Sequence, residues 1–170
     1  MKRAQRSMFI TVFILMSLML VSAALAKDKM MRSGAMAVET ILTPEEMKWG
    51  PAPESLPPGA ELAVLEGDPL KSGPFTMRLK VPANYRIPPH WHASAEHVTV
   101  VAGTFNVAKG EKEDASVKGK ELPAGSFFMM TPRSSHYAWA SEETVIQLHG
   151  RGPWMINYVN PADDPRKQAK

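Results

Sequence analysis

Three side chains that can bind a metal ion, those of His90, His92 and Glu96, lie within one short run of the sequence. Residues i and i+2 of a β-strand point to the same face, so His90 and His92 would present two imidazoles side by side. After a turn at residues 93–95, Glu96 begins the next strand and can join the pair. Two imidazoles and one carboxylate suit a borderline divalent metal and leave coordination positions open.

A further ligand would come from a distant strand, and His136 is the candidate. It begins the run 136–140, where it shares a face with Ala138 and Ala140, whose small side chains leave room beside it. The same alternation turns His97 away from Glu96. Two structural interpretations remain open: a solvated strand end with an ion pair for the first three residues, and an ordinary core histidine for His136.

The spacing of these residues resembles the two motifs of the cupin superfamily. The histidine pair, Glu96 four residues later and Gly103 after six more residues correspond to the first motif, and Gly125 followed after ten residues by His136 corresponds to the second. The resemblance covers about residues 60–158. It implies an all-β, antiparallel jelly-roll barrel that holds one metal ion through His90, His92, Glu96 and His136, and it implies a homodimer.

Two turn positions differ in residue type from the cupin motifs. Asn84 stands six residues before the first histidine, where the family has glycine, and asparagine tolerates a positive φ better than most residues. Arg133 stands at the usual glycine position before His136, and Ala140 replaces a terminal asparagine. These differences concern the turns beside the ligands and not the ligands themselves.

The strand pattern begins near residue 61. Apolar residues alternate with polar ones over 75–81, which predicts a strand with one buried face. Further strands are expected at about 96–102, 104–108, 126–130, 136–140, 144–149 and 153–159. Glycines and prolines separate them, residues 109–120 form a charged loop, and a short helix is expected from Thr43 to Trp49. Many short strands without interleaved helices favour an antiparallel sandwich or small barrel.

The first 26 residues predict a secretory signal peptide, with a basic start, an apolar run at residues 8–21 and small residues before a cleavage site after Ala26. We therefore expect an exported protein, periplasmic or secreted. The expected divisions are a signal peptide at 1–26, an arm with the short helix at 27–58, the cupin barrel at 59–160 and a polar tail at 161–170. The chain has no cysteine, so it must fold without disulfides.

Removal of the signal peptide changes the interpretation of charge. Its three charges are all basic, so 17 basic residues remain against 17 acidic ones. A neutral mature chain does not favour nucleic acid or a membrane surface as a partner. The expected partner is a small-molecule substrate or ligand.

The leading functional hypothesis is a metal-dependent enzyme that oxidises a small organic molecule with molecular oxygen. The alternatives are a non-catalytic module that binds a metal or small ligand, and a metal-assisted isomerase or hydrolase. The ion would be zinc, copper, iron or manganese, and export favours the first two because copper and zinc stand highest in intrinsic affinity. Gln147, His149 and Tyr85 are weaker candidates for the substrate pocket. No catalytic residue beyond the ligands is assigned.

Overall fold

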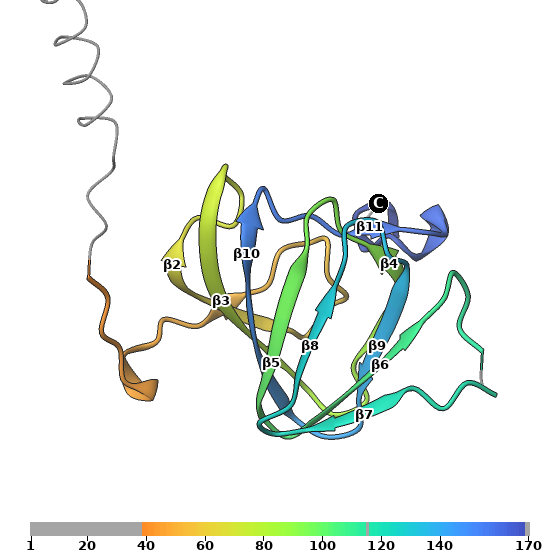
Figure 1. Ribbon diagram of the computed structural model, residues 1–170, viewed down its shortest axis with the longest axis horizontal. Helices are drawn as coiled ribbons and strands as arrows, with labels where there is room; N and C mark the ends of the chain where they lie inside the picture. The colour runs from red at the N-terminus through yellow and green to blue at the C-terminus, as the bar shows by residue number, and fades with distance from the viewer. Residues whose placement is uncertain (1–38, 115, 169–170) are drawn as a thin grey trace, which may run out of the picture. The chain divides into compact units, whose positions relative to one another are not determined.

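The computed structural model describes residues 39–114 and 116–168. The expected signal peptide and residues 27–38 of the arm lie outside these residues. Within the described part, no helix is long and apolar enough to cross a membrane. The elements belong to the unit Thr40–Lys170 and form two antiparallel sheets with almost no helix, as expected for an all-β jelly roll (Figure 1).

The larger sheet has six strands in the order β1-β2-β3-β10-β5-β8, and the smaller has five in the order β11-β4-β9-β6-β7. The strands of the larger sheet are β1 Gly50–Pro51, β2 Glu61–Gly67, β3 Gly73–Val81, β10 Thr144–Gly152, β5 Glu96–Ala102 and β8 Phe127–Met130. Those of the smaller sheet are β11 Asn157–Tyr158, β4 Arg86–Trp91, β9 His136–Ala140, β6 Thr104–Lys109 and β7 Lys120–Pro123. Three short helical segments complete the described part: η1 Pro44–Glu46, η2 Pro161–Asp163 and α2 Pro165–Gln168.

The core lies between the two sheets, where the inward faces of the strands meet. The period-two pattern of β3 buries Phe75, Met77, Leu79 and Val81, while the residues between them are half-buried. Strand β10 lies beside β3 and adds Ile146 and Leu148, and the smaller sheet adds residues such as Phe105. This apolar interior surrounds the histidines of the first cupin motif.

Strand β4 carries His90 and contains two prolines, which lack the N–H that a regular ladder needs. Its pairing with β9 is irregular between Ile87 and His90, and this irregularity accommodates Pro88 and Pro89. The ladder resumes at His90, which lies directly opposite His136 of β9. Pairing across the sheet therefore brings the two motifs together.

Three expectations about local structure need correction. The helix expected from Thr43 to Trp49 is a single 3-10 turn, η1, although Thr43 N–H does donate to Glu46 Oε2 at 2.8 Å. Of the strand expected at 153–159, only Asn157–Tyr158 pairs, with β4, and residues 153–156 are not in a strand. The tail after Pro161, whose polar composition predicts a frayed end, is folded over residues 161–168, since Arg166 donates to Asp164 and to the carbonyl of Ile156.

The positive-φ positions explain how the motif turns close. Asn84 has φ 64° and Arg133 has φ 61°, so both take the left-handed conformation expected where the cupin motifs carry glycine. Gly103 has φ 72°, and a Cβ added there would lie 2.4 Å from the carbonyl oxygen of Glu143. Gly103 is thus required both by its backbone conformation and by the close approach of β10.

Replacement of Gly103 tests this requirement. We expect Gly103→Ala to lower the free energy of unfolding by about 2 kcal/mol or more, from left-handed strain and the backbone clash. Gly50→Ala is the matched control, because a Cβ there meets nothing within 4 Å and the midpoint should move little. Urea titrations of the two variants make the comparison, and equal midpoints would contradict the assignment.

Candidate metal centre

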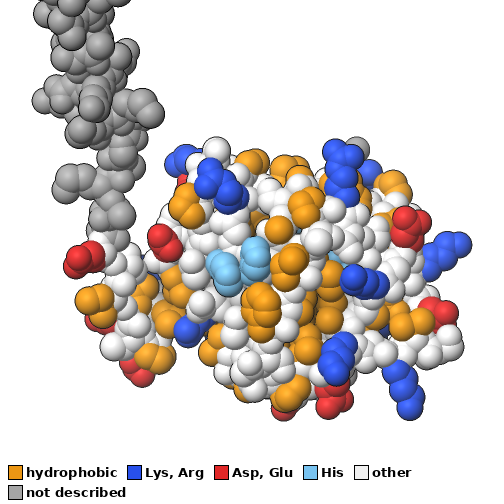
Figure 2. All heavy atoms as spheres, in the orientation of Figure 1, with side chains coloured by type: hydrophobic (Ala, Val, Ile, Leu, Met, Phe, Trp, Pro, Cys, Tyr) orange, Lys and Arg blue, Asp and Glu red, His pale blue; other side chains and the backbone are white. Residues whose placement is uncertain are grey.

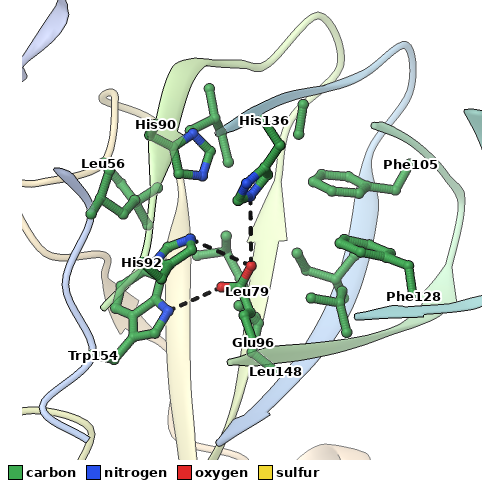
Figure 3. A pocket seen from close by; sticks show the side chains of 15 residues that line it. Leu56, Leu79, His90, His92, Glu96, Phe105, Phe128, His136, Leu148 and Trp154 are labelled. Atoms are coloured by element: carbon green, nitrogen blue, oxygen red, sulfur yellow. Dashed lines mark hydrogen bonds and ion pairs between the residues drawn. The ribbon is translucent and has the colours of Figure 1, made fainter. Parts of the chain in front are cut away.

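Three histidines from the two motifs converge inside the barrel. His90 lies in β4, His92 just beyond its end and His136 at the start of β9, and all three are at least 96% buried. One ring nitrogen from each lies within 4.8 Å of the others. Figure 3 shows the three rings turned toward one another. Imidazoles packed this closely need a common partner or a chain of hydrogen bonds between them.

The backbone fixes which nitrogen each ring presents. Nδ1 lies 2.7 Å from the Pro88 carbonyl in His90, 2.8 Å from the Met155 carbonyl in His92, and 2.9 Å from the Ser134 carbonyl in His136. A carbonyl oxygen only accepts, so each Nδ1 must carry the proton. In the neutral ring, Nε2 then carries the lone pair, which is the tautomer that a metal ligand requires.

Glu96 brings a carboxylate to the same point from the start of β5. Its Oε2 lies 3.4 Å from His92 Nε2 and 3.9 Å from His136 Nε2, while its Oε1 accepts a 3.0 Å hydrogen bond from Trp154 Nε1. The Trp154 ring also stacks on His92 at 5.5 Å between centroids. We call His90, His92, Glu96 and His136 the ligand cluster.

Burial keeps two of the imidazoles neutral. Desolvation lowers the pKa of His90 well below its usual 6.5, and the nearby His136 and His92 rings lower it further. Desolvation also lowers the pKa of His136, against the opposing effects of its backbone hydrogen bond and of Glu96. Their Nε2 lone pairs are therefore available near pH 7, where an ordinary surface histidine is partly protonated.

These donors fit a divalent ion. Nε2 of His92 is buried without a hydrogen-bond partner, which is costly unless a ligand occupies the site. Two donors about 2.1 Å from one ion lie roughly 3.0–4.2 Å apart, so the two carboxylate separations already fall in this range. The histidine nitrogens lie within 4.8 Å of one another, so those at the upper end of this separation would have to approach when an ion binds.

The cavity beside the ligand cluster is small and mostly apolar. Its volume is about 20 Å³, room for about one water molecule. Phe105 and Phe128 lie on the side opposite Leu56 and Trp154 (Figure 3). Among the lining residues, only the ligand cluster can titrate. Acid–base chemistry by a side chain at this point would therefore have to use the ligands themselves.

The residues suggested for a substrate pocket lie elsewhere. Gln147 lies on the outer face of the larger sheet, because its neighbours Ile146 and Leu148 occupy the inward face of β10. There it accepts a hydrogen bond from Arg78. His149 is exposed on that outer face and stacks on His97 at 5.0 Å. Histidines are visible at the surface beside hydrophobic side chains in Figure 2. The signal in the sequence was the pair of apolar residues Ile146 and Leu148, which assign the inward face of β10 and leave Gln147 and His149 on the outer face.

Tyr85 also lies away from the cavity lining. It is buried, and its hydroxyl donates to the carbonyl of Pro57 at 2.5 Å. The sequence interpretation missed two residues that do line the cavity, Trp154 and Leu56. Trp154 falls in the strand expected at 153–159 and Leu56 in a proline-rich segment with no strand periodicity, and both lie outside the two motifs, so neither had a local signal for the site.

The loop before His136 is held by the other motif. Arg133 N–H donates to the carbonyl of His92 at 2.8 Å, and the Arg133 guanidinium lies 5.8 Å from the centre of the Trp91 ring. The loop that carries the last ligand is thus tied directly to the strand end that carries the first two.

Comparison with known proteins agrees with this architecture. Residues 37–155 match the family model described as ChrR Cupin-like domain. No protein with a curated description matches the sequence.

Solved structures share the fold at low sequence identity. They include an acetylacetone dioxygenase from Acinetobacter johnsonii, with 20% identity, TM-score 0.59, and coverage of 78% of this chain and 85% of that one. The polyketide cyclase RemF from Streptomyces resistomycificus has 14% identity, TM-score 0.61, and coverage of 76% and 92%. An RmlC-like cupin from Shewanella frigidimarina has 16% identity, TM-score 0.53, and coverage of 68% and 92%. At these identities the likeness supports the fold alone.

The Trp154 hydrogen bond gives a test of the centre. Trp154→Phe keeps an aromatic ring beside His92 but removes the donor that orients Glu96, and loss of such an outer partner weakens metal binding by about 10- to 100-fold. Isothermal titration calorimetry with Zn²⁺ measures this. Trp139→Phe is the matched control, since Trp139 packs against Tyr137 and Gly119 away from the cavity. Unchanged affinity in Trp154→Phe would show that Glu96 does not depend on it.

Proposed function

The chain belongs to the family of ChrR cupin-like domains, and from this we propose that its ligand cluster binds one divalent metal ion at which molecular oxygen oxidises a small organic molecule. The observation that carries the proposal is the convergence of three buried, tautomer-fixed imidazoles and one carboxylate within an apolar barrel. Fold alone does not decide the reaction, so the argument rests on what lines the site.

The lining favours oxidation over hydrolysis or isomerisation. Hydrolysis and isomerisation are commonly assisted by a side chain that moves a proton, and the cavity offers no titratable group outside the ligand cluster. A redox-active divalent ion, when bound, would itself supply the activation of oxygen. The remaining residues would then hold the ligands and exclude water, which the apolar side chains from both sheets do.

The size of the cavity favours a second candidate, a module that binds a metal without turnover. A space of about 20 Å³ admits oxygen or water but not an organic substrate, whose pockets usually measure about 300–1,000 Å³. Catalysis on such a substrate therefore requires the barrel end to open. The acetylacetone dioxygenase from Acinetobacter johnsonii has a similar fold. This fold is therefore compatible with an oxidation, but it does not establish that this chain carries one out.

The identity of the ion separates these candidates. Nitrogen and oxygen donors without sulfur suit zinc, copper, iron and manganese, and a protein that loads its metal after export would favour copper or zinc by intrinsic affinity. A redox-active ion supports oxidation, whereas zinc supports binding or hydrolysis. Elemental analysis of the protein isolated from its own compartment distinguishes them.

Oxygen uptake tests the leading proposal. We expect the metal-loaded protein to consume oxygen with at least one member of a panel of enolic and phenolic compounds, and His92→Ala, which lacks a ligand, to consume none above the buffer rate. An oxygen electrode records both. If a loaded protein, with one ion per chain, is inactive across the panel, the non-catalytic candidate replaces this one.

We also propose that the protein is exported and acts outside the cytoplasm as a periplasmic or secreted chain. The support is the basic start, apolar run and small-residue end of the first 26 residues. The mature chain should begin at Lys27, and mass spectrometry of its N-terminal peptide measures this. A chain that keeps residues 1–26 would contradict export by this route. The homodimer implied by the cupin resemblance remains a prediction.

A further inference from the structure

A proline-rich segment closes one end of the barrel. It comprises residues 51–60 and includes Pro51, Pro53, Pro57 and Pro58, and we call it the proline segment. Prolines lack the N–H donor, so this stretch cannot join a sheet along its length. Among the described residues, it is held by few hydrogen bonds in relation to its length.

Leu56 places the proline segment at the ligand cluster. It is 97% buried and lines the cavity beside His90, where Figure 3 shows it at the edge of the site. It also lines a surface pocket of about 380 Å³, formed by the proline segment with Pro165 and Arg166 of α2. Leu56 is the residue common to the two linings. One leucine side chain thus separates a site with room for one water from a pocket of ligand size.

Two tyrosine hydroxyls attach the proline segment to the barrel. Tyr158 donates to the carbonyl of Ser55 at 2.8 Å, and Tyr85 donates to that of Pro57. Burial raises the pKa of both tyrosines, so both remain donors at any physiological pH. Within the segment, Leu56 N–H donates to Pro53, and Ala52 N–H to Ala60. A stretch with so few attachments opens more easily than the paired strands below it.

We propose that the proline segment is the gate to the metal centre, that Leu56 is the side chain that moves, and that the outer pocket first receives a small, uncharged, largely apolar molecule. This deepens the proposed function and rests on it for the use of the metal. It also explains how an organic substrate could reach the metal, although the closed cavity beside the ligand cluster has room for only about one water molecule.

The lining of the outer pocket gives the class of ligand. Most of it is proline, alanine and Leu56, and its charged side chains are Glu54 and Arg166. Arg166 already donates to both carboxylate oxygens of Asp164 and to the Ile156 carbonyl, which leaves little for an anionic ligand. Glu54 is exposed and solvated. Binding in this pocket would therefore depend on apolar contact.

Chemical modification of metal-free protein tests the gate without depending on metal binding. Diethyl pyrocarbonate acylates accessible neutral imidazoles, and peptide mass spectrometry locates each modified histidine. Exposed His149 should react fast in every variant and serves as the internal reference. The three histidines of the ligand cluster should react slowly in the unaltered chain. Tyr158→Phe should speed them about fivefold, the factor for loss of one hydrogen bond, and Leu56→Ala should speed them by more.

Leu148→Ala is the matched control, because Leu148 lines the same cavity from β10 but does not reach the outer pocket. It should leave the relative rates within about twofold of those of the unaltered chain, if access and not general loosening limits the reaction. Equal acceleration by Leu148→Ala and Leu56→Ala would overturn the proposal, and so would unchanged rates in Tyr158→Phe. Failure of the protein to bind metal in calorimetry would remove the proposed function but leave the gate standing.

Phenol and glucose test the ligand class. In amide-resolved NMR titrations, phenol should shift the signals of Ala52, Gly59 and Ala60, which lie around the outer pocket. Glucose at the same concentration should not. Shifts confined to other parts of the barrel, or equal shifts from both compounds, would overturn the assignment of the pocket.

Discussion

The polar groups at the centre of this barrel impose the constraint on which the rest depends. Three imidazoles and a carboxylate are buried together, and each imidazole uses its Nδ1 proton on a backbone carbonyl. The other ring nitrogen of each histidine, Nε2, carries a lone pair. These lone pairs repel one another, and none of the three nitrogens has a proton to donate in a hydrogen bond to another. Burying them is unfavourable unless a cation occupies the centre. The chain has no cysteine and therefore no disulfide to stabilise it. A metal ion bound at this site would add to the stability of the folded state as well as serving function.

The surrounding structure supplies the backbone carbonyls at the right places. Those of Pro88 and Ser134 each lie two residues before the histidine they bind, so the strands orient their own ligands. That of Met155 comes from the segment crossing the barrel end, whose neighbour Trp154 also holds Glu96. The ligand geometry therefore depends on this crossing segment as much as on the motif strands.

The interior is well suited to hold an ion and poorly suited to admit a substrate. Apolar residues from both sheets surround the ligand cluster and leave space for about one water. Such walls strengthen electrostatic interactions at the centre and keep it dry. Because these walls leave no room for an organic substrate, selection of a substrate would take place at the barrel end that the proline segment closes. There, Tyr85 and Tyr158 donate to the proline segment, and Leu56 lines both the cavity and the outer pocket.

The sequence determined the antiparallel all-β class and the four residues of the ligand cluster, because alternation and spacing decide which neighbours share a face. It could not decide which face meets the interior for every strand: Gln147 and His149 share a face, but it is the outer one. It placed the histidine pair in a strand but could not predict the irregular pairing that accommodates two prolines in β4, since that pairing depends on β9. Trp154 and Leu56 lie outside both motifs, 58 and 40 residues from Glu96, so only the tertiary structure could place them at the site. Local periodicity is a property of neighbouring residues, whereas convergence on one point is a property of the folded chain.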